Sequence, residues 1–344
     1  MSGGVDSTVA AFLLNKRGYD VTGVFMKFWH EKDETKRNIG FNRCCSADSY
    51  DSARNAAHLI GIPIYSWNFE TLFKKKVVDE FINEYRVNRT PNPCVGCNRE
   101  IKFGEFYKKA KHLGADFIAT GHYVRKVKIG VDYFLKKGID KEKDQSYFLW
   151  NLKPEVINHC LFPLGNLKKT HVKKIASDNH LPISSKESQE ICFIDQEISS
   201  FLKKYLKVKK GMIKDLMTKK ILGAHPGLIN YTIGQRSGLG LAGGPWYVVK
   251  KDLKKNILWI TNLVDDLFGR EIMINKVNWL VKPRIFPLNL EVKPRYRSPA
   301  AKAKIIKAGI NLRVIFKRPQ KALTPGQSAV FYKRDILMGG GIIV

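Results

Sequence analysis

Residues 2–8, with the sequence SGGVDST, decide the fold of the N-terminal half of the chain. Gly3 and Gly4 let the backbone approach an anion closely, and Ser2 and Ser7 add hydroxyl donors. An apolar pattern of helical spacing starts within this stretch, so the glycines should lie at a helix N-terminus, where the dipole favours phosphate. The stretch has no Gly-Lys-Ser/Thr and is therefore not a Walker loop. It predicts a phosphate-binding loop, and a serine-capped helix start is the alternative.

Short apolar strands and amphipathic helices alternate through the first half of the chain. We expect helices over 5–17, 48–60, 71–85 and 100–113, and strands over 21–28, 62–67 and 116–120. This alternation predicts an α/β domain with a parallel sheet covered by helices on both faces. Such a domain normally has a strand directly before its Gly-rich loop, so a native start upstream of Met1 is left open.

The pattern changes near residue 200. Short β-type runs broken by Gly and Pro follow at 229–232, 246–249, 257–261, 291–292, 311–315 and 329–332. They predict a small central domain and then a C-terminal β-barrel or sandwich. The expected domains are 1–200, 201–268 and 269–344, with boundaries read from this change of pattern.

The chain is strongly basic, with 60 Lys and Arg against 31 Asp and Glu and a formal charge of +29. Such an excess favours a polyanionic partner, although lysines that only solvate the surface would give the same composition. No apolar run reaches the 18 residues of a membrane span, and no export signal is visible. We therefore expect a cytoplasmic protein whose six cysteines are reduced.

Two cysteine segments suggest thiol chemistry. Cys94 and Cys97 lie in a proline-rich loop near Arg89, Arg99 and Lys102, whose charge would favour a nucleophilic thiolate. A zinc half-site is the rival, but it needs two further ligands, and Cys44-Cys45 has poor spacing for chelation. Cys192 lies in an apolar run and by itself reads as a core cysteine. Cys160 lies in an apolar stretch that we expect to be helical.

The loop at 2–8 is similar to the SGGxDS loop of the PP-loop ATP pyrophosphatases, which have an adenine nucleotide α-hydrolase-like fold. The whole chain further resembles the bacterial tRNA-specific 2-thiouridylases (the MnmA family). The shared strings include TPNPCVGCNREIKF at 90–103, ATGHY at 119–123, KDQSYF at 143–148, ICFI at 191–194, YTIGQR at 231–236, RYR at 295–297 and TPGQ at 324–327. Position 94, which is Asp in some members, is Cys here.

The resemblance implies a set of site residues. ATP, with Mg²⁺, would contact Met1, Ser2, Gly3, Gly4, Val5, Asp6, Ser7, Met26 and Gly121. The target base would meet Asn92, Pro93 and Cys94, and the tRNA would contact His122, Lys143, Asp144, Gln145, Arg295, Tyr296 and Gln327. Cys97 would be the nucleophile and Cys192 the persulfide carrier.

The resemblance also implies the reaction. ATP would adenylate the C2 oxygen of uridine 34 in tRNAs of the Lys, Glu and Gln type. A persulfide supplied by a cysteine desulfurase or relay protein would then deliver sulfur and leave a Cys97–Cys192 disulfide. A [4Fe–4S] cluster on Cys94, Cys97 and Cys192 is an open alternative.

Two other functions remain open at this point: a small-molecule ligase of the PP-loop superfamily, and a basic RNA-binding protein without activity. We expect a monomer that does not bind membranes.

Overall fold

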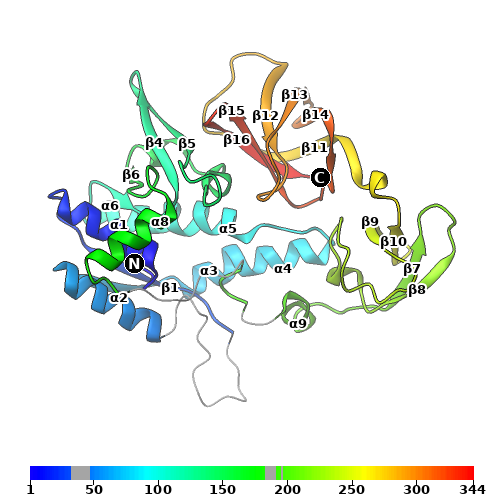
Figure 1. The fold of residues 1–344 in the computed structure, drawn as a ribbon, viewed down its shortest axis with the longest axis horizontal. Helices are drawn as coiled ribbons and strands as arrows, with labels where there is room; N and C mark the ends of the chain where they lie inside the picture. The colour runs from blue at the N-terminus through cyan, green and yellow to red at the C-terminus, as the bar shows by residue number, and fades with distance from the viewer. Residues whose placement is uncertain (32–46, 183–190, 195–196) are drawn as a thin grey trace. The chain divides into compact units, whose positions relative to one another are not determined.

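The computed structural model describes residues 1–31, 47–182, 191–194 and 197–344 (Figure 1). By its contacts the chain forms two compact units. The first consists of Met1–Val78, Pro93–Asp195 and Asp335–Leu337, and the second of Asp79–Asn92, Gln196–Arg334 and Met338–Val344. The boundaries of the three domains expected from the sequence stay a prediction.

The first unit has the expected parallel α/β pattern. Strand β1 (Gly23–Lys27) pairs in parallel with β2 (Ile64–Asn68), and β3 (Ile118–Ala119) with β6 (Cys160–Leu161). The helices α1 (Val5–Lys16), α2 (Ala47–Ile60) and α8 (Lys169–Asp178) accompany them. Their apolar faces meet in one buried cluster that includes Val9, Ala57, Leu164 and Val172. The apolar spacing that predicted the helices is therefore the face that builds this core.

The segment around Cys94 and Cys97 is helical earlier than predicted. Helix α5 (Pro93–Gly96), the π-helical turn η2 (Cys97–Glu105) and α6 (Phe106–His112) follow one another directly. The expected loop was wrong from Pro93 onward, because proline is well suited to the first helical position and does not break a helix there. Both thiols therefore lie on helical backbone near the start of this helical run.

The expected helix over 71–85 is divided between the units. In the first unit it begins with α3 (Glu70–Phe73) and the π-helical turn η1 (Lys74–Val78). Helix α4 (Asp79–Arg86) is counted with the second unit.

Several elements of the first unit were missed. A hairpin of β4 (Val124–Ile129) and β5 (Asp132–Lys137) turns at Gly130, which has φ +63°. Two short helices, η3 (Ser146–Leu149) and α7 (Pro154–Ile157), follow it. Cys160 lies in strand β6, so the helix expected around it was wrong.

After α4, the second unit continues with α9 (Ile198–Lys203) and a four-stranded sheet of order β8-β7-β10-β9. Its strands are β7 (Gly211–Asp215), β8 (Ile221–His225), β9 (Tyr247–Asp252) and β10 (Ile257–Thr261). The strand expected over 229–232 was wrong: Leu228–Asn230 is a 3₁₀ turn, η4. Asn230 bonds back to the Gly227 carbonyl through both its backbone N and its side-chain Nδ2, and this local bonding competes with strand pairing.

A six-stranded barrel ends the chain, as expected. After the 3₁₀ turn η5 (Val264–Leu267), its strands run in the order β11-β14-β13-β12-β15-β16, and β11 pairs with β16 to close it. They are β11 (Phe268–Trp279), β12 (Leu288–Lys293), β13 (Ala301–Ala308), β14 (Asn311–Lys321), β15 (Ser328–Lys333) and β16 (Ile336–Ile343). Ile274, Val292, Ile305, Val314 and Phe331 fill its interior. Across the described ranges, no helix is long and apolar enough to cross a bilayer.

Candidate active site

The Gly-rich loop is a compact turn at the start of α1. The Ser2 amide donates to Ser7 Oγ at 3.1 Å, and Ser7 Oγ donates to the Gly4 carbonyl at 3.0 Å. Gly3 has φ +75°, a conformation that side chains disfavour. A Cβ on Gly3 would also lie 2.3 Å from the Ser49 carbonyl oxygen, so only glycine fits there.

Gly121 borders this loop. A Cβ at this position would lie 2.8 Å from the Asp6 carbonyl carbon and 3.0 Å from the Ser7 amide nitrogen. The Met1 amino group donates to the Val24 carbonyl on β1, the strand that also carries Met26. The structure thus brings Gly121 against the loop and places Met1 beside β1, as a shared nucleotide site requires.

Asp6 is the centre of a polar network that sequence reasoning missed. Its Oδ1 accepts hydrogen bonds from Lys169 Nζ at 2.6 Å and from the Tyr123 hydroxyl at 2.8 Å. Burial, together with the negative charge of Asp6, raises the pKa of Tyr123 well above its usual range, so the phenol stays a donor. Lys169 has only 15% of its side chain exposed, and its backbone N donates to Asp140 at 2.9 Å. Lys169 therefore holds a cation beside the phosphate loop.

The segment 143–145 supports the same region. Gln145 Oε1 accepts from the Tyr123 amide at 3.0 Å, and the Gln145 amide donates to the Tyr123 carbonyl at 3.0 Å. Asp144 is buried and accepts from the Gly138 amide and from Ser146. The Lys143 amide donates to Asp140 at 3.3 Å. These bonds give Asp144 and Gln145 a structural role, and their contact with tRNA stays a prediction.

His122 is buried and neutral. Burial and the positive charge of Lys102 lower the pKa of His122 well below its usual value. Its Nδ1 lies 2.9 Å from Thr120 Oγ1, and its ring packs against Phe103 with the centroids 5.7 Å apart. The tRNA contact expected of this imidazole stays a prediction.

The first pair of thiols lies near the start of the helical run. Cys97 is 7% exposed and Cys94 is half-buried. The neighbouring Asn98 donates to the Phe148 carbonyl at 3.1 Å and so fixes η2 against η3. Arg99 pairs with Glu100 at 3.1 Å, so part of the positive charge expected near the thiols is neutralised.

Cys192 belongs to the same unit, in the short described segment Ile191–Ile194. It is half-buried, while the adjacent Phe193 is buried with its ring 5.7 Å from that of Phe73. Residues 183–190, which precede this segment, lie outside the described residues, as do Cys44 and Cys45.

Cys160 has a different environment. It is fully buried and donates to the Val156 carbonyl at 3.1 Å, and burial raises its pKa to about 12.

A metal site is not formed by the described residues. Among them, no group of three His, Cys, Asp or Glu side chains could hold an ion. Cys94, Cys97 and Cys192 therefore do not form a single-ion site such as zinc, and the [4Fe–4S] alternative stays a prediction.

In the second unit, the barrel holds the segment that leads into the thiol helix. Gln327 Nε2 donates to the Thr90 carbonyl at 2.7 Å, and the Thr90 amide donates to the Pro325 carbonyl at 3.0 Å. Gly326 has φ +90°, and a Cβ there would lie 2.8 Å from Arg89 Cβ. Gln327 thus positions the backbone just before Asn92.

Arg295 and Tyr296 lie in the turn that follows β12, not on a strand. Arg295 Nη2 donates to the Ile233 carbonyl at 3.5 Å, and Lys293 Nζ lies 5.2 Å from the centroid of the Tyr296 ring. Arg295 therefore connects the barrel to the segment 231–236 of the same unit.

Comparison with known proteins places these features in a family. The chain matches family models described as the tRNA methyl transferase HUP domain (residues 1–196), its PRC-barrel domain (199–262) and the aminomethyltransferase beta-barrel domain (269–343). It is 46% identical to the tRNA-specific 2-thiouridylase MnmA 2 of Thermoanaerobacter sp. (strain X514), over all of this chain and 96% of that protein. The chain belongs to the MnmA family.

Other MnmA relatives are similar over the same length. The tRNA-specific 2-thiouridylases MnmA of Clostridioides difficile (strain 630) and Listeria innocua serovar 6a are 43% and 42% identical. The matches cover all of this chain and 96% and 93% of those proteins. The MnmA resemblance therefore extends through both units, including the loop at Asp6 and the barrel loop at Gln327.

Proposed function

We propose that this chain catalyses the ATP-dependent 2-thiolation of uridine 34 in tRNAs of the Lys, Glu and Gln type. The observation that carries the proposal is the Gly-rich loop with Gly121 against it, in a chain similar over its full length to tRNA-specific 2-thiouridylases. The enzyme would act in the cytoplasm, where it meets its tRNA substrates.

The first step activates a poor electrophile. The C2 oxygen of uridine attacks the α-phosphorus of ATP, and the bond to the β-phosphate oxygen breaks to release pyrophosphate. The amides at the start of α1, Ser2 and Ser7 bind the departing anion, and Lys169 adds a cation. Asp6, whose side chain is 37% exposed, is the carboxylate that would face the Mg²⁺ bound to the phosphates.

The second step transfers sulfur. A persulfide on Cys192, received from a cysteine desulfurase or a relay protein, attacks C2, and AMP leaves with the former C2 oxygen. The Cys97 thiolate then attacks the Cys192 sulfur, which breaks the S–S bond to the base and releases 2-thiouridine. A cellular dithiol reductant restores the Cys97–Cys192 pair.

Nucleoside mass spectrometry tests the proposal. The purified protein is incubated with ATP, Mg²⁺, a cysteine desulfurase with L-cysteine as persulfide donor, a dithiol reductant and unmodified tRNA, and both 2-thiouridine and pyrophosphate are measured. We expect both products only when tRNA is present. Pyrophosphate release that does not depend on RNA would favour a small-molecule ligase, and RNA binding without any use of ATP would favour a non-enzymatic protein.

A further inference from the structure

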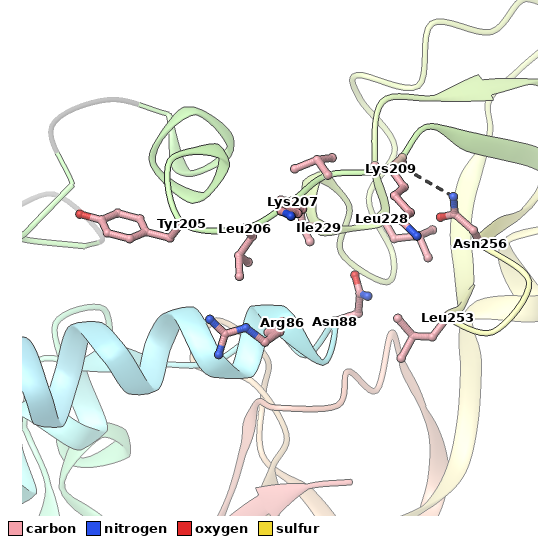
Figure 2. A pocket seen from close by; sticks show the side chains of 12 residues that line it. Arg86, Asn88, Tyr205, Leu206, Lys207, Lys209, Leu228, Ile229, Leu253 and Asn256 are labelled. Carbon is pink, nitrogen blue, oxygen red and sulfur yellow. Dashed lines mark hydrogen bonds between the residues drawn. The ribbon is translucent and has the colours of Figure 1, made fainter.

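A cavity of about 450 Å³ lies within the second unit (Figure 2), and none of its lining residues belongs to the Gly-rich loop. Four segments line it: the end of α4, residues 205–209, residues 227–229 and the turn between β9 and β10. No role in the proposed reaction uses these residues. The cavity is therefore a candidate for a second binding site.

The floor of the cavity is apolar and closely packed. Leu206 and Leu228 are 8% and 5% exposed. Gly227 lets the Val208 side chain pack against its backbone, since a Cβ there would lie 2.0 Å from Val208 Cγ1. Asn256 Nδ2 donates to the Lys210 carbonyl at 2.8 Å and contacts the Lys209 carbonyl, which ties the 205–209 side to the β9–β10 turn. These contacts hold the segments that line the cavity together.

The rim carries three cations. Arg86, Lys207 and Lys209 are exposed, and no acidic side chain occurs among the described residues that line the cavity. Arg86 donates to the neutral amide oxygen of Asn83, and none of the three forms an ion pair within the described parts of the chain. The nearby Glu84 is engaged by Arg89 at 3.6 Å and Lys276 at 3.8 Å. The rim therefore offers uncompensated positive charge.

Asn88 adds an acceptor to this basic site. It has φ +54°, and its side chain projects from the end of the α4 segment toward residues 206–209 (Figure 2). Its Oδ1 is buried and has no hydrogen-bond partner among the described residues. A buried acceptor without a partner is costly, so a ligand that brings a donor would be stabilised there.

We propose that this cavity binds a nucleotide of the RNA substrate. The phosphate lies on Arg86, Lys207 and Lys209, the ribose or base covers Leu206 and Leu228, and a 2′-hydroxyl or base N–H donates to Asn88 Oδ1. A ribonucleotide combines an anion, an apolar face and a donor, whereas an acidic peptide satisfies mainly the cations. This inference rests on the proposed function, because it takes tRNA as the substrate.

A matched pair of triple variants tests the charges. Arg86→Ala/Lys207→Ala/Lys209→Ala is compared with Arg17→Ala/Lys16→Ala/Lys111→Ala, which removes one Arg and two Lys from exposed positions in the first unit. Filter binding of tRNA by the full chain is measured over a salt series. We expect the cavity variant to bind roughly 10–100-fold more weakly than the control, with a log–log salt slope smaller by about 1, since one phosphate contact is lost.

A single variant tests the acceptor. Asn88→Gly removes the amide and keeps the positive φ without strain. We expect roughly 3- to 10-fold weaker binding of an anticodon stem-loop RNA, and no change for the same stem-loop as DNA if the 2′-hydroxyl is the donor. Equal weakening for both would assign the donor to a base and still support a nucleotide site. Unchanged affinity for both would remove Asn88 from the site.

These measurements distinguish failure of the proposed RNA site from failure of the proposed function. ATP binding and thermal unfolding, measured on each variant, report whether the chain is folded. If the cavity variant binds tRNA as tightly as the control triple, the RNA site is overturned. If it keeps tRNA binding but loses thiolation only with a protein sulfur donor, the cavity serves an acidic protein segment instead. If the wild-type chain neither binds tRNA nor thiolates it, the proposed function itself fails.

Discussion

The ion pair between Lys169 and Asp6 lies at the Gly-rich loop, so substitutions there should affect the use of ATP. Lys169→Met removes the cation 2.6 Å from Asp6, so we expect roughly 100-fold slower pyrophosphate release. Lys169→Arg should recover part of the rate, because it keeps the charge. Asp6→Ala and Ser7→Ala should abolish the reaction, and tRNA affinity should stay within about twofold in all four variants, since phosphates of RNA are bound elsewhere. Parallel loss of release and of filter binding would contradict this separation.

The cysteines should differ sharply in their effects. We expect Cys97→Ser and Cys192→Ser each to abolish thiolation, while Cys160→Ser and Cys44→Ser remain active. Burial raises the pKa of Cys160 to about 12, so at pH 8 only roughly one thiol in ten thousand is ionised. The thiolate gains population only as the pH rises toward that pKa, so iodoacetamide should leave Cys160 unmodified in the folded protein at pH 8. Peptide mass spectrometry measures this labelling. Full activity of Cys97→Ser with a protein persulfide donor would refute the two-thiol scheme.

Cys94 separates the persulfide route from the cluster route. A persulfide relay should tolerate Cys94→Asp, because Asp occupies this position in some members of the family, whereas a cluster needs the third thiolate. We expect anaerobically purified protein to contain no stoichiometric iron and the Asp variant to thiolate tRNA. Iron and sulfide near four per chain, together with an inactive variant, would establish the cluster.

The barrel loop 324–327 contacts the backbone at Thr90 within the second unit, just before the thiol helix begins in sequence. Gln327→Ala removes the bond to the Thr90 carbonyl, and the segment before Pro93 should become less ordered. We expect roughly tenfold lower kcat for thiolation with the KM for ATP unchanged, because the loop at Asp6 is untouched. Gln320→Ala is the matched control, since the side-chain amide of Gln320 donates to carbonyls of its own strand. Equal activity of the two variants would show that Gln327 does not position this segment.

The elements with clear periodicity could be predicted from the sequence, and those set by tertiary contacts could not. The apolar faces of α1 and α2 and the strands β1 and β10 were correctly placed. The helix start at Pro93 was missed because a proline-rich stretch also reads as a loop. Lys169 is 163 residues from Asp6, and Thr90 is 237 residues from Gln327, so no local pattern reveals either contact. The lowered pKa of His122 likewise depends on its burial beside Phe103 and on the charge of Lys102, and no spacing connects these residues to it.

Across the whole molecule, positive charge is distributed through both units. The hairpin β4–β5, the cavity rim and the barrel each carry several Lys or Arg. A polyanion as long as a tRNA can neutralise many such charges at once, while a small anion reaches one or two. Whether the charge excess serves RNA binding must therefore be tested with RNA itself and not with a small anion.

Salt dependence tests whether this charge binds RNA or only solvates the surface. Each phosphate neutralised releases counterions, so the logarithm of the affinity should fall linearly with the logarithm of the salt concentration. With six or more phosphate contacts, raising salt from about 50 to 200 mM should weaken tRNA binding roughly 1,000-fold or more. ATP affinity, measured in the same buffers at constant free Mg²⁺, should change far less, because the loop at α1 binds phosphate through amides and hydroxyls as well as charge. A flat response for tRNA would mean that most of the lysines are solvated surface residues, and the RNA would then have to be held by the few contacts around the target base.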